Sequence, residues 1–311
     1  SVVAAVSDDS LVRLVNLSSL RRMLYLKCDG SRLCFDPAGR RLGTFLRGNE
    51  VGWLDLARSS EFSETTVVSG VEIDRCELSP DGRWIASGVH GKSGSQIDVR
   101  EAETQRKLVR FGAGPSAMMA FDPAGDGILT SDLRGLWRWR ISDRSASPAT
   151  VKRTAVRVGV GWRELAFSAD GSRFVAANVV SNLAYVYDRT LTDCLVAVGR
   201  HEGLETVAIS PDGLRVATGS PTARDISVWD VTSRVQLTNF PAGAESRISF
   251  SGDGKWLLVH GDRFELRDTR RWNLAPPLAF PQDIVPGGAA AFSHDGRLLV
   301  TVIGDFELQL F

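Results

Sequence analysis

Ser210-Pro211-Asp212-Gly213-Leu214 is one copy of a five-residue motif that recurs along the whole chain of 311 residues. Each copy begins with Ser or Asp and carries Gly at its fourth position. Successive copies begin 41 to 46 residues apart. A period of this length predicts a repeat architecture, with one small structural unit per period. The seven copies occupy residues 36–40, 79–83, 122–126, 168–172, 210–214, 251–255 and 293–297.

The period around the fifth copy shows what one unit contains. Residues 206–209, 214–220, 225–230 and 235–240 are predicted strands, because they are rich in strand-forming residues and are separated by turn clusters. In the motif, Pro presets φ and Gly supplies a positive φ. Four consecutive short strands form an antiparallel meander, and several such sheets packed around an axis bury both faces of each. The predicted fold class is therefore all-β: a β-propeller of four-stranded antiparallel blades.

The third predicted strand of most units carries an aromatic residue or an arginine near its end, as at Trp229 and Arg100. We expect these side chains to pack against the neighbouring blade, where an arginine covers apolar surface with its stem. Packing of this kind accounts for the eight tryptophans without a cofactor-stacking role.

Over essentially its whole length the chain resembles the WD-repeat family of β-propellers. The best copy reads His201-Glu202-Gly203, then the motif at 210–214, then Ala217-Thr218-Gly219-Ser220 and Val228-Trp229-Asp230. In that family a His, a Ser or Thr, a Trp and a loop Asp form a buried hydrogen-bonded network. His201, Thr218 and Trp229 match three of these positions. Ala223 stands at the Asp position, so the resemblance implies an incomplete network.

The two ends of the chain leave the number of blades open. Residues 1–20 are predicted to form a partial blade, holding the second and third strands of a unit, and 21–311 the propeller itself. Residues 21–27 are predicted to be a fourth strand that completes the last blade beside 306–311, which favours seven blades. The alternative is eight blades, one without its inner strand and one without its outer strand.

Composition narrows the function classes. Lys+Arg and Asp+Glu are both 37, and this neutral balance argues against a general nucleic-acid binder. No uncharged apolar run is long enough to span a membrane. Four cysteines without a paired spacing and four scattered histidines predict no metal site and no cofactor. The first residue is Ser1, so we expect the natural N-terminus to lie upstream, in a cytoplasmic protein.

The candidate binding residues lie in predicted loops that join second to third strands and fourth to first strands. These loops are expected on one face, and they are rich in cations and aromatic residues, which are common at interface hot spots. The aspartates of the repeated motif are interpreted as turn formers, because Asp bonds its own backbone in such turns. The candidates are Arg47, His90, Lys92, Arg134, Trp162, Arg163, Arg200, Arg224, Arg247, His260 and Arg263.

These features predict a non-enzymatic interaction scaffold or ligand-sensing propeller whose partner is a protein or an acidic peptide. The degenerate repeats resemble bacterial members of the family, which implies a C-terminal position beside a signalling effector in a larger protein. The alternative function is an enzyme, or a propeller that binds a small ligand or metal, with a site at the axial channel mouth near His90 and His260.

Overall fold

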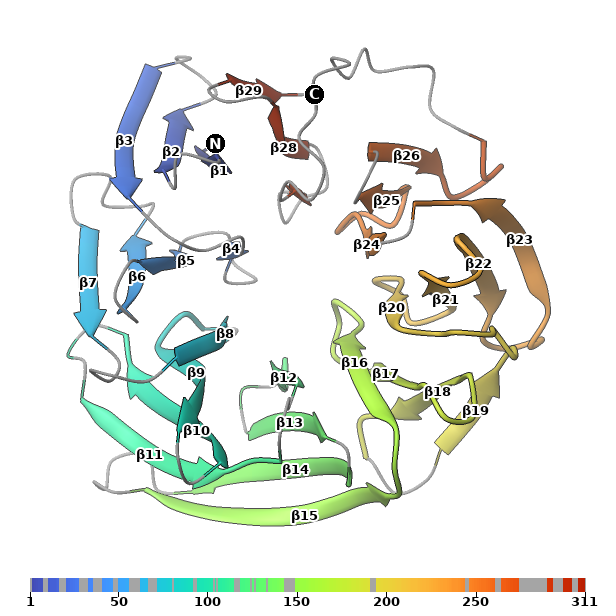
Figure 1. Cartoon of the computed structure of the whole chain (residues 1–311), viewed down its shortest axis with the longest axis horizontal. Helices are drawn as coiled ribbons and strands as arrows, with labels where there is room; N and C mark the ends of the chain where they lie inside the picture. Colours follow the sequence, from blue (N-terminus) through green and yellow to red (C-terminus); the bar gives the residue numbers. More distant parts are fainter. Residues whose placement is uncertain are drawn as a thin grey trace. The chain divides into compact units, whose positions relative to one another are not determined.

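A computed structural model of the chain describes the backbone of the strands and, between residues 77 and 273, most of the side chains. The described residues contain strands and turns but no helix (Figure 1). They are residues 2–7, 11–16, 21–27, 33–35, 41–46, 50–55, 62–66, 72–79, 81–91, 94–102, 104, 106–114, 118–123, 125, 127–132, 134–142, 149–190, 194–243, 246–260, 264–273, 290–292, 299–303 and 307–310.

The chain divides into two compact units, of which the first comprises residues 1–113, 141–151 and 281–311. Its strands pair into antiparallel sheets, in the sheet orders β1-β2-β3, β4-β5-β6-β7, β8-β9-β10-β11 and β27-β28-β29. The strands are β1 (Val2–Ser7), β2 (Leu11–Asn16), β3 (Arg21–Lys27), β4 (Leu33–Phe35), β5 (Arg41–Leu46), β6 (Glu50–Asp55), β7 (Phe62–Thr66), β8 (Glu72–Leu78), β9 (Trp84–Gly91), β10 (Gly94–Glu101), β11 (Lys107–Gly112), β27 (Ala290–Phe292), β28 (Leu299–Ile303) and β29 (Glu307–Leu310).

The second unit comprises residues 114–140 and 152–280, and β14 and β15 run across the division. Its sheet orders are β12-β13-β14-β15, β16-β17-β18-β19, β20-β21-β22-β23 and β24-β25-β26. The strands are β12 (Met118–Phe121), β13 (Gly127–Asp132), β14 (Gly135–Ser142), β15 (Thr150–Val158), β16 (Trp162–Phe167), β17 (Arg173–Asn178), β18 (Leu183–Asp188), β19 (Cys194–Val198), β20 (Thr206–Ile209), β21 (Arg215–Ser220), β22 (Asp225–Asp230), β23 (Gln236–Pro241), β24 (Arg247–Phe250), β25 (Trp256–His260) and β26 (Phe264–Asp268).

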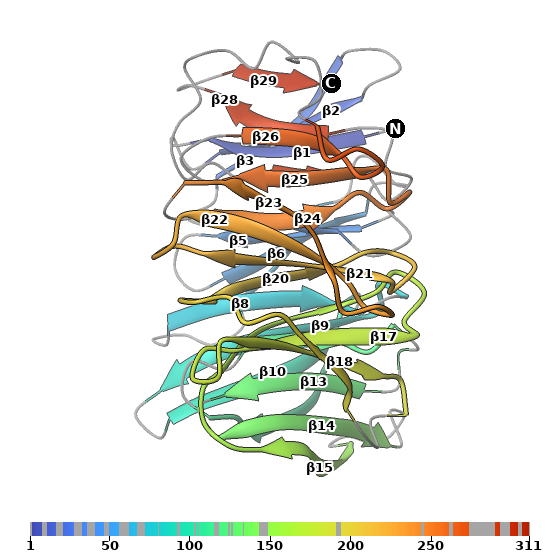
Figure 2. The ribbon, with the colours of Figure 1, turned by 90° about the vertical axis from the view of Figure 1, so that its right-hand side faces the viewer.

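Burial in the second unit follows the order of the strands within each sheet. The first strands β12, β16, β20 and β24 lie side by side, and the middle strands β21 and β22 are buried along most of their length. The antiparallel run from β20 to β23 is visible in Figure 2. The fourth strands β15 and β23 are mostly exposed. Small and β-branched side chains in the middle strands therefore fill the core between neighbouring sheets.

The repeated motif forms a hydrogen-bonded turn between the first and second strands. Ser210 Oγ donates to Asp212 Oδ1 over 2.5 Å, and Arg215 N donates to Ser210 Oγ over 2.9 Å. Gly213 has a φ of 69°, which favours glycine. The same Ser–Asp bond recurs in the turns that begin at Ser79, Ser168 and Ser251. These contacts confirm the turn role of Asp81, Asp170, Asp212 and Asp253. The carboxylate of Asp122 instead accepts a hydrogen bond from Arg138, and the copies at 36–40 and 293–297 lie outside the described residues.

Strand pairing at the N-terminus differs from the sequence prediction. Residues 21–27 were expected beside 306–311, but β3 pairs with β2, with Leu11 opposite Lys27. That prediction was therefore wrong about the partner of this strand. The physical reason is local, because closing the short loop after β2 costs less chain entropy than recruiting a strand from the far end of the chain. The number of blades stays a prediction.

Candidate functional site

In an antiparallel meander, the segments that join second to third strands and fourth to next first strands lie at the same end of the sheets. We call these segments of the second unit, with the first two residues of β16 and β24, the loop end. They join β13 to β14, β15 to β16, β17 to β18, β19 to β20, β21 to β22 and β23 to β24.

Five of the predicted binding residues are exposed arginines at the loop end. The described side chains there also include two exposed carboxylates, Glu202 and Glu205, so cations are in excess. The arginines are Arg134, Arg163, Arg200, Arg224 and Arg247. For the remaining candidates other than Trp162, the side chains lie outside the described part of the chain: Arg47, His90, Lys92, His260 and Arg263.

Trp162 is not an exposed binding residue, which corrects the sequence prediction. Its exposed fraction is 4%, and its ring packs against Tyr185 with 5.3 Å between ring centroids. It belongs to a core cluster that includes Leu165 and Phe174. Trp162 is the first residue of β16. Its indole lies between neighbouring sheets, where its large apolar area is removed from water.

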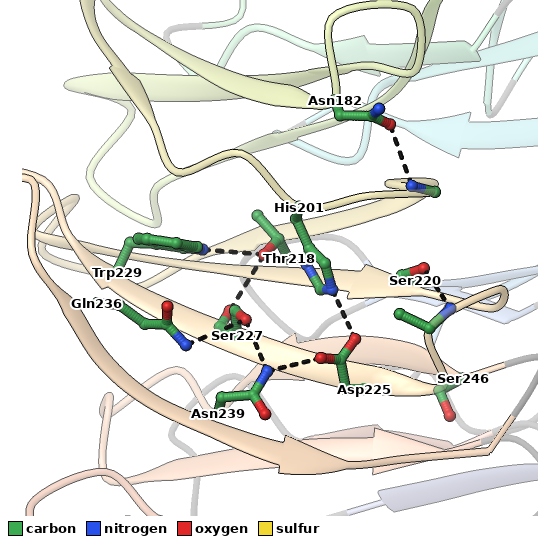
Figure 3. A network of polar contacts seen from close by, with 12 residues as sticks. Asn182, His201, Thr218, Ser220, Asp225, Ser227, Trp229, Gln236, Asn239 and Ser246 are labelled. Atoms are coloured by element: carbon green, nitrogen blue, oxygen red, sulfur yellow. Dashed lines mark hydrogen bonds and ion pairs between the residues drawn. The ribbon is translucent and has the colours of Figure 1, made fainter.

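The hydrogen-bonded network around His201 is complete, contrary to the sequence prediction (Figure 3). His201 is 5% exposed, with Nδ1 2.7 Å from Thr218 Oγ1 and Nε2 2.7 Å from Asp225 Oδ1. Trp229 Nε1 donates to the same Thr218 oxygen over 3.0 Å. The acid is therefore Asp225, which the sequence reading missed.

Local geometry explains why the acid is Asp225 and not the residue at position 223. Ala223 lies in the exposed turn before β22, whereas Asp225 is the first residue of β22 and pairs with Ser220 of β21. Asp225 Oδ2 also accepts a hydrogen bond from Asn239 Nδ2 over 2.7 Å. The signal that could have found it is the strand register, because Asp225 stands two residues before Ser227, the partner of Thr218.

The threonine, histidine and aspartate of this network are the groups of a nucleophilic triad, but their burial gives them a structural role. A catalytic hydroxyl must reach a substrate. Thr218 is fully buried, and its Oγ1 donates to the Ser227 carbonyl while it accepts from Trp229. The hydroxyl therefore joins β21, β22 and the loop before β20. A related bond joins Trp139 Nε1 to Thr130 Oγ1 over 2.9 Å in the sheet of β12 to β15.

Other reactive groups in the described part of the chain are few. Cys194 is a free, half-buried thiol, and burial raises its pKa, so the reactive thiolate is disfavoured. Within the described ranges, no group of three or more His, Cys, Asp or Glu side chains is arranged to hold a metal ion. No helix among the described residues is long and apolar enough to cross a membrane.

Comparison with known proteins identifies the fold but not the family. No protein-family model matches the sequence, and no curated protein matches it. The chain is similar to a chain of the crystal structure of a mitotic checkpoint complex, with a TM-score of 0.67 and 16% identity, covering 100% of this chain and 90% of that one. It is also similar to the dihydro-heme d1 dehydrogenase NirN in complex with DHE, with a TM-score of 0.72 and 17% identity, covering 99% and 70%. The fold is a β-propeller. At these identities the likeness carries no conclusion about activity.

Proposed function

We propose that this chain is a non-enzymatic WD-repeat-type propeller that binds an acidic protein or peptide through the loop end of its second unit. The observation that carries the proposal is the set of five exposed arginines there, against two exposed glutamates among the described side chains. A local excess of positive charge attracts anionic partners and raises their association rate. One propeller of similar fold is part of a protein complex, which is consistent with a protein partner.

Exposed arginines also occur at the opposite end of the sheets, but there they share their turns with aspartates, as Arg189 does with Asp188 and Arg270 with Asp268. There the carboxylates of Asp170, Asp212 and Asp253 accept hydrogen bonds from the turns they form. Their role is explained by turn stability. The loop-end arginines remain to be explained, and binding of an acidic partner accounts for them. In this proposal the chain serves as the recognition part of a larger regulatory protein.

The test is selection of random dodecapeptides displayed on phage against the immobilised chain. We expect the selected peptides to be rich in Asp and Glu. Their affinity should fall about tenfold or more when Arg200→Glu, Arg224→Glu and Arg247→Glu are combined, which corresponds to about 1.4 kcal/mol. The matched control combines Arg189→Glu, Arg270→Glu and Arg271→Glu, because these exposed arginines lie in turns at the other end of the sheets. The proposal is wrong if no peptide is selected, or if both triple variants bind alike.

A further inference from the structure

The three most exposed large apolar side chains of the described residues belong to two valines of the loop end and to the last residue of β15. They are Val158 at 72%, Val160 at 65% and Val180 at 65% exposed, and we call them the valine patch. Val180 lies against the loop that carries Val160, because a Cβ at Gly161 would come within 2.5 Å of Val180 Cγ2. Clustered apolar exposure on a soluble protein marks an interaction site more often than scattered exposure does.

Hydrogen bonds fix the backbone that presents the valine patch. Gly159 N donates to the Arg134 carbonyl over 3.0 Å, and Asn178 Nδ2 donates to the Val160 carbonyl over 2.9 Å. The Asn178 Oδ1 atom accepts from Val180 N over 3.1 Å. Asn178 therefore holds both the loop that carries Val160 and the turn that carries Val180. A surface held in one conformation loses less entropy when it binds a partner.

Glycines and the buried indole explain why the valines face outward. Gly159 and Gly161 have φ values of 144° and 89°, which allow the chain to turn on both sides of Val160. Trp162 fills the space beneath, and its Nε1 lies 3.9 Å from the position that a Cβ on Gly159 would take. The core position next to the loop is thus already filled by an indole, so the valines remain in solvent.

Positive charge accompanies the valine patch. Arg134, Arg157 and Arg163 are exposed, and the Arg157 guanidinium lies 5.5 Å from the centre of the Tyr185 ring. The neighbouring carboxylates are engaged by the protein itself. Asp132 is buried and accepts from the backbone N–H groups of Arg134, Gly135 and Gly114. Glu164 accepts from Val207 N over 3.1 Å. The surface therefore combines exposed valines with exposed arginines that are close to them in sequence or, for Arg134, hydrogen-bonded through the backbone to their loop.

We propose that the valine patch, with Arg134, Arg157 and Arg163, binds an acidic segment of a partner protein through one or two large apolar side chains. This inference rests on the proposed function and names the place and the chemistry of the partner. A peptide is favoured over an anionic membrane, because membrane-binding faces bury Trp, Phe or Leu, whereas these are short valines on a backbone that is hydrogen-bonded in place.

The test uses three fluorescein-labelled octapeptides and the full chain, with fluorescence anisotropy as the readout. The first peptide has Leu-Phe at its centre and three acidic residues on each side, the second replaces Leu-Phe by Ala-Ala, and the third replaces the acidic residues by Lys. We expect the first to bind at least about tenfold more tightly than the others, because only it satisfies both the patch and the arginines.

The variants separate the valine patch from the rest of the loop end. Val160→Ser with Val180→Ser, and Arg134→Glu with Arg163→Glu, should each weaken the first peptide about tenfold or more. Val235→Ser with Arg189→Glu removes an exposed valine and an exposed arginine elsewhere and should change its affinity less than about twofold. All these side chains are exposed, so the variants should fold.

Each remaining outcome counts against the inference. It is overturned if the Ala-Ala peptide binds as well as the first, if the serine variants bind like the parent chain, or if anionic phosphatidylserine vesicles bind the chain through the same valines. The proposed function fails separately. Selected peptides that depend on Arg200, Arg224 and Arg247 but not on the valine patch would leave the proposed function standing and this inference refuted.

Discussion

Three buried tryptophans differ in what their indole N–H groups contact. Trp229 and Trp139 donate to the hydroxyls of Thr218 and Thr130. Trp162 Nε1 has no hydrogen-bond partner in the described part of the chain, although the ring is equally buried. A buried donor without a partner costs free energy, whereas a bonded one contributes about 0.5–1.5 kcal/mol. In this unit, Trp229 and Trp139 therefore stabilise the fold by both packing and a hydrogen bond, whereas Trp162 stabilises it by packing alone.

Replacement of each indole by a phenyl ring tests this difference. Trp229→Phe should lower the free energy of unfolding by about 1–2 kcal/mol more than Trp162→Phe does, because only the first change removes a hydrogen bond. Both changes remove the same atoms, so the packing loss largely cancels. Urea unfolding followed by far-UV circular dichroism measures the two values. Trp162→Ala should cost about 3–5 kcal/mol, as expected for a packed ring. Equal losses for the two Phe variants would refute the assignment.

At the scale of elements, one loop glycine allows two sheets of the second unit to pack. Gly199 lies between β19 and β20, and a Cβ on it would stand 2.0 Å from Trp229 Cη2. Trp229 extends from β22 into a cluster with Val175 and Val198 of the preceding sheet. The expectation that third-strand aromatics pack against the neighbouring blade is confirmed for this tryptophan. The loop must therefore pass the ring with no side chain at this position.

Gly199→Ala should lower the free energy of unfolding by about 1–3 kcal/mol, because the added methyl group meets the buried Trp229 ring and because the φ of 24° at Gly199 is unfavourable for alanine. Gly112→Ala is the matched control, since a Cβ there meets nothing within 4 Å and Gly112 has no positive φ. Denaturant unfolding of both variants gives the comparison. In a Trp229→Leu background the cost of Gly199→Ala should fall, and strict additivity of the two changes would contradict the steric explanation.

The sequence predicted elements better than it predicted individual contacts. The Ser-x-Asp-Gly turns were predictable because each turn is made by neighbouring residues, and the strands between them follow from composition. Asp225 was missed because its role depends on strand register, which places it within reach of a histidine 24 residues earlier. The burial of Trp162 could not be predicted either, because the side chain of a tryptophan after a glycine-rich loop can point inward or outward. Packing against Tyr185, which the sequence does not show, favours the inward position.

For the whole molecule, the same turns link stability to pH through several carboxylates. Burial by itself raises the pKa of Asp170, but hydrogen bonds from Ser168 and Ser172 outweigh it and leave the pKa lowered. Asp253 shows the same balance, with bonds from Lys255 and Ser251. In a different turn, between β22 and β23, hydrogen bonds from the Ser233 backbone and hydroxyl lower the pKa of Asp230. The turns therefore favour the charged form of each carboxylate.

A lowered pKa in the folded state means that the unfolded chain binds protons first as the pH falls. The ordinary value for Asp is 3.8, so the stability from these groups is fully present well above that pH and is lost as the pH falls through it toward the folded-state values. We expect the free energy of unfolding to be level between about pH 7 and 5 and to decline below about pH 4. Combined Asp170→Asn and Asp253→Asn should make that decline shallower, because Asn keeps the turn bonds that Oδ1 accepts but does not titrate. Urea unfolding at a series of pH values measures both slopes, and an unchanged slope in the double variant would mean that the turn carboxylates do not carry the acid sensitivity.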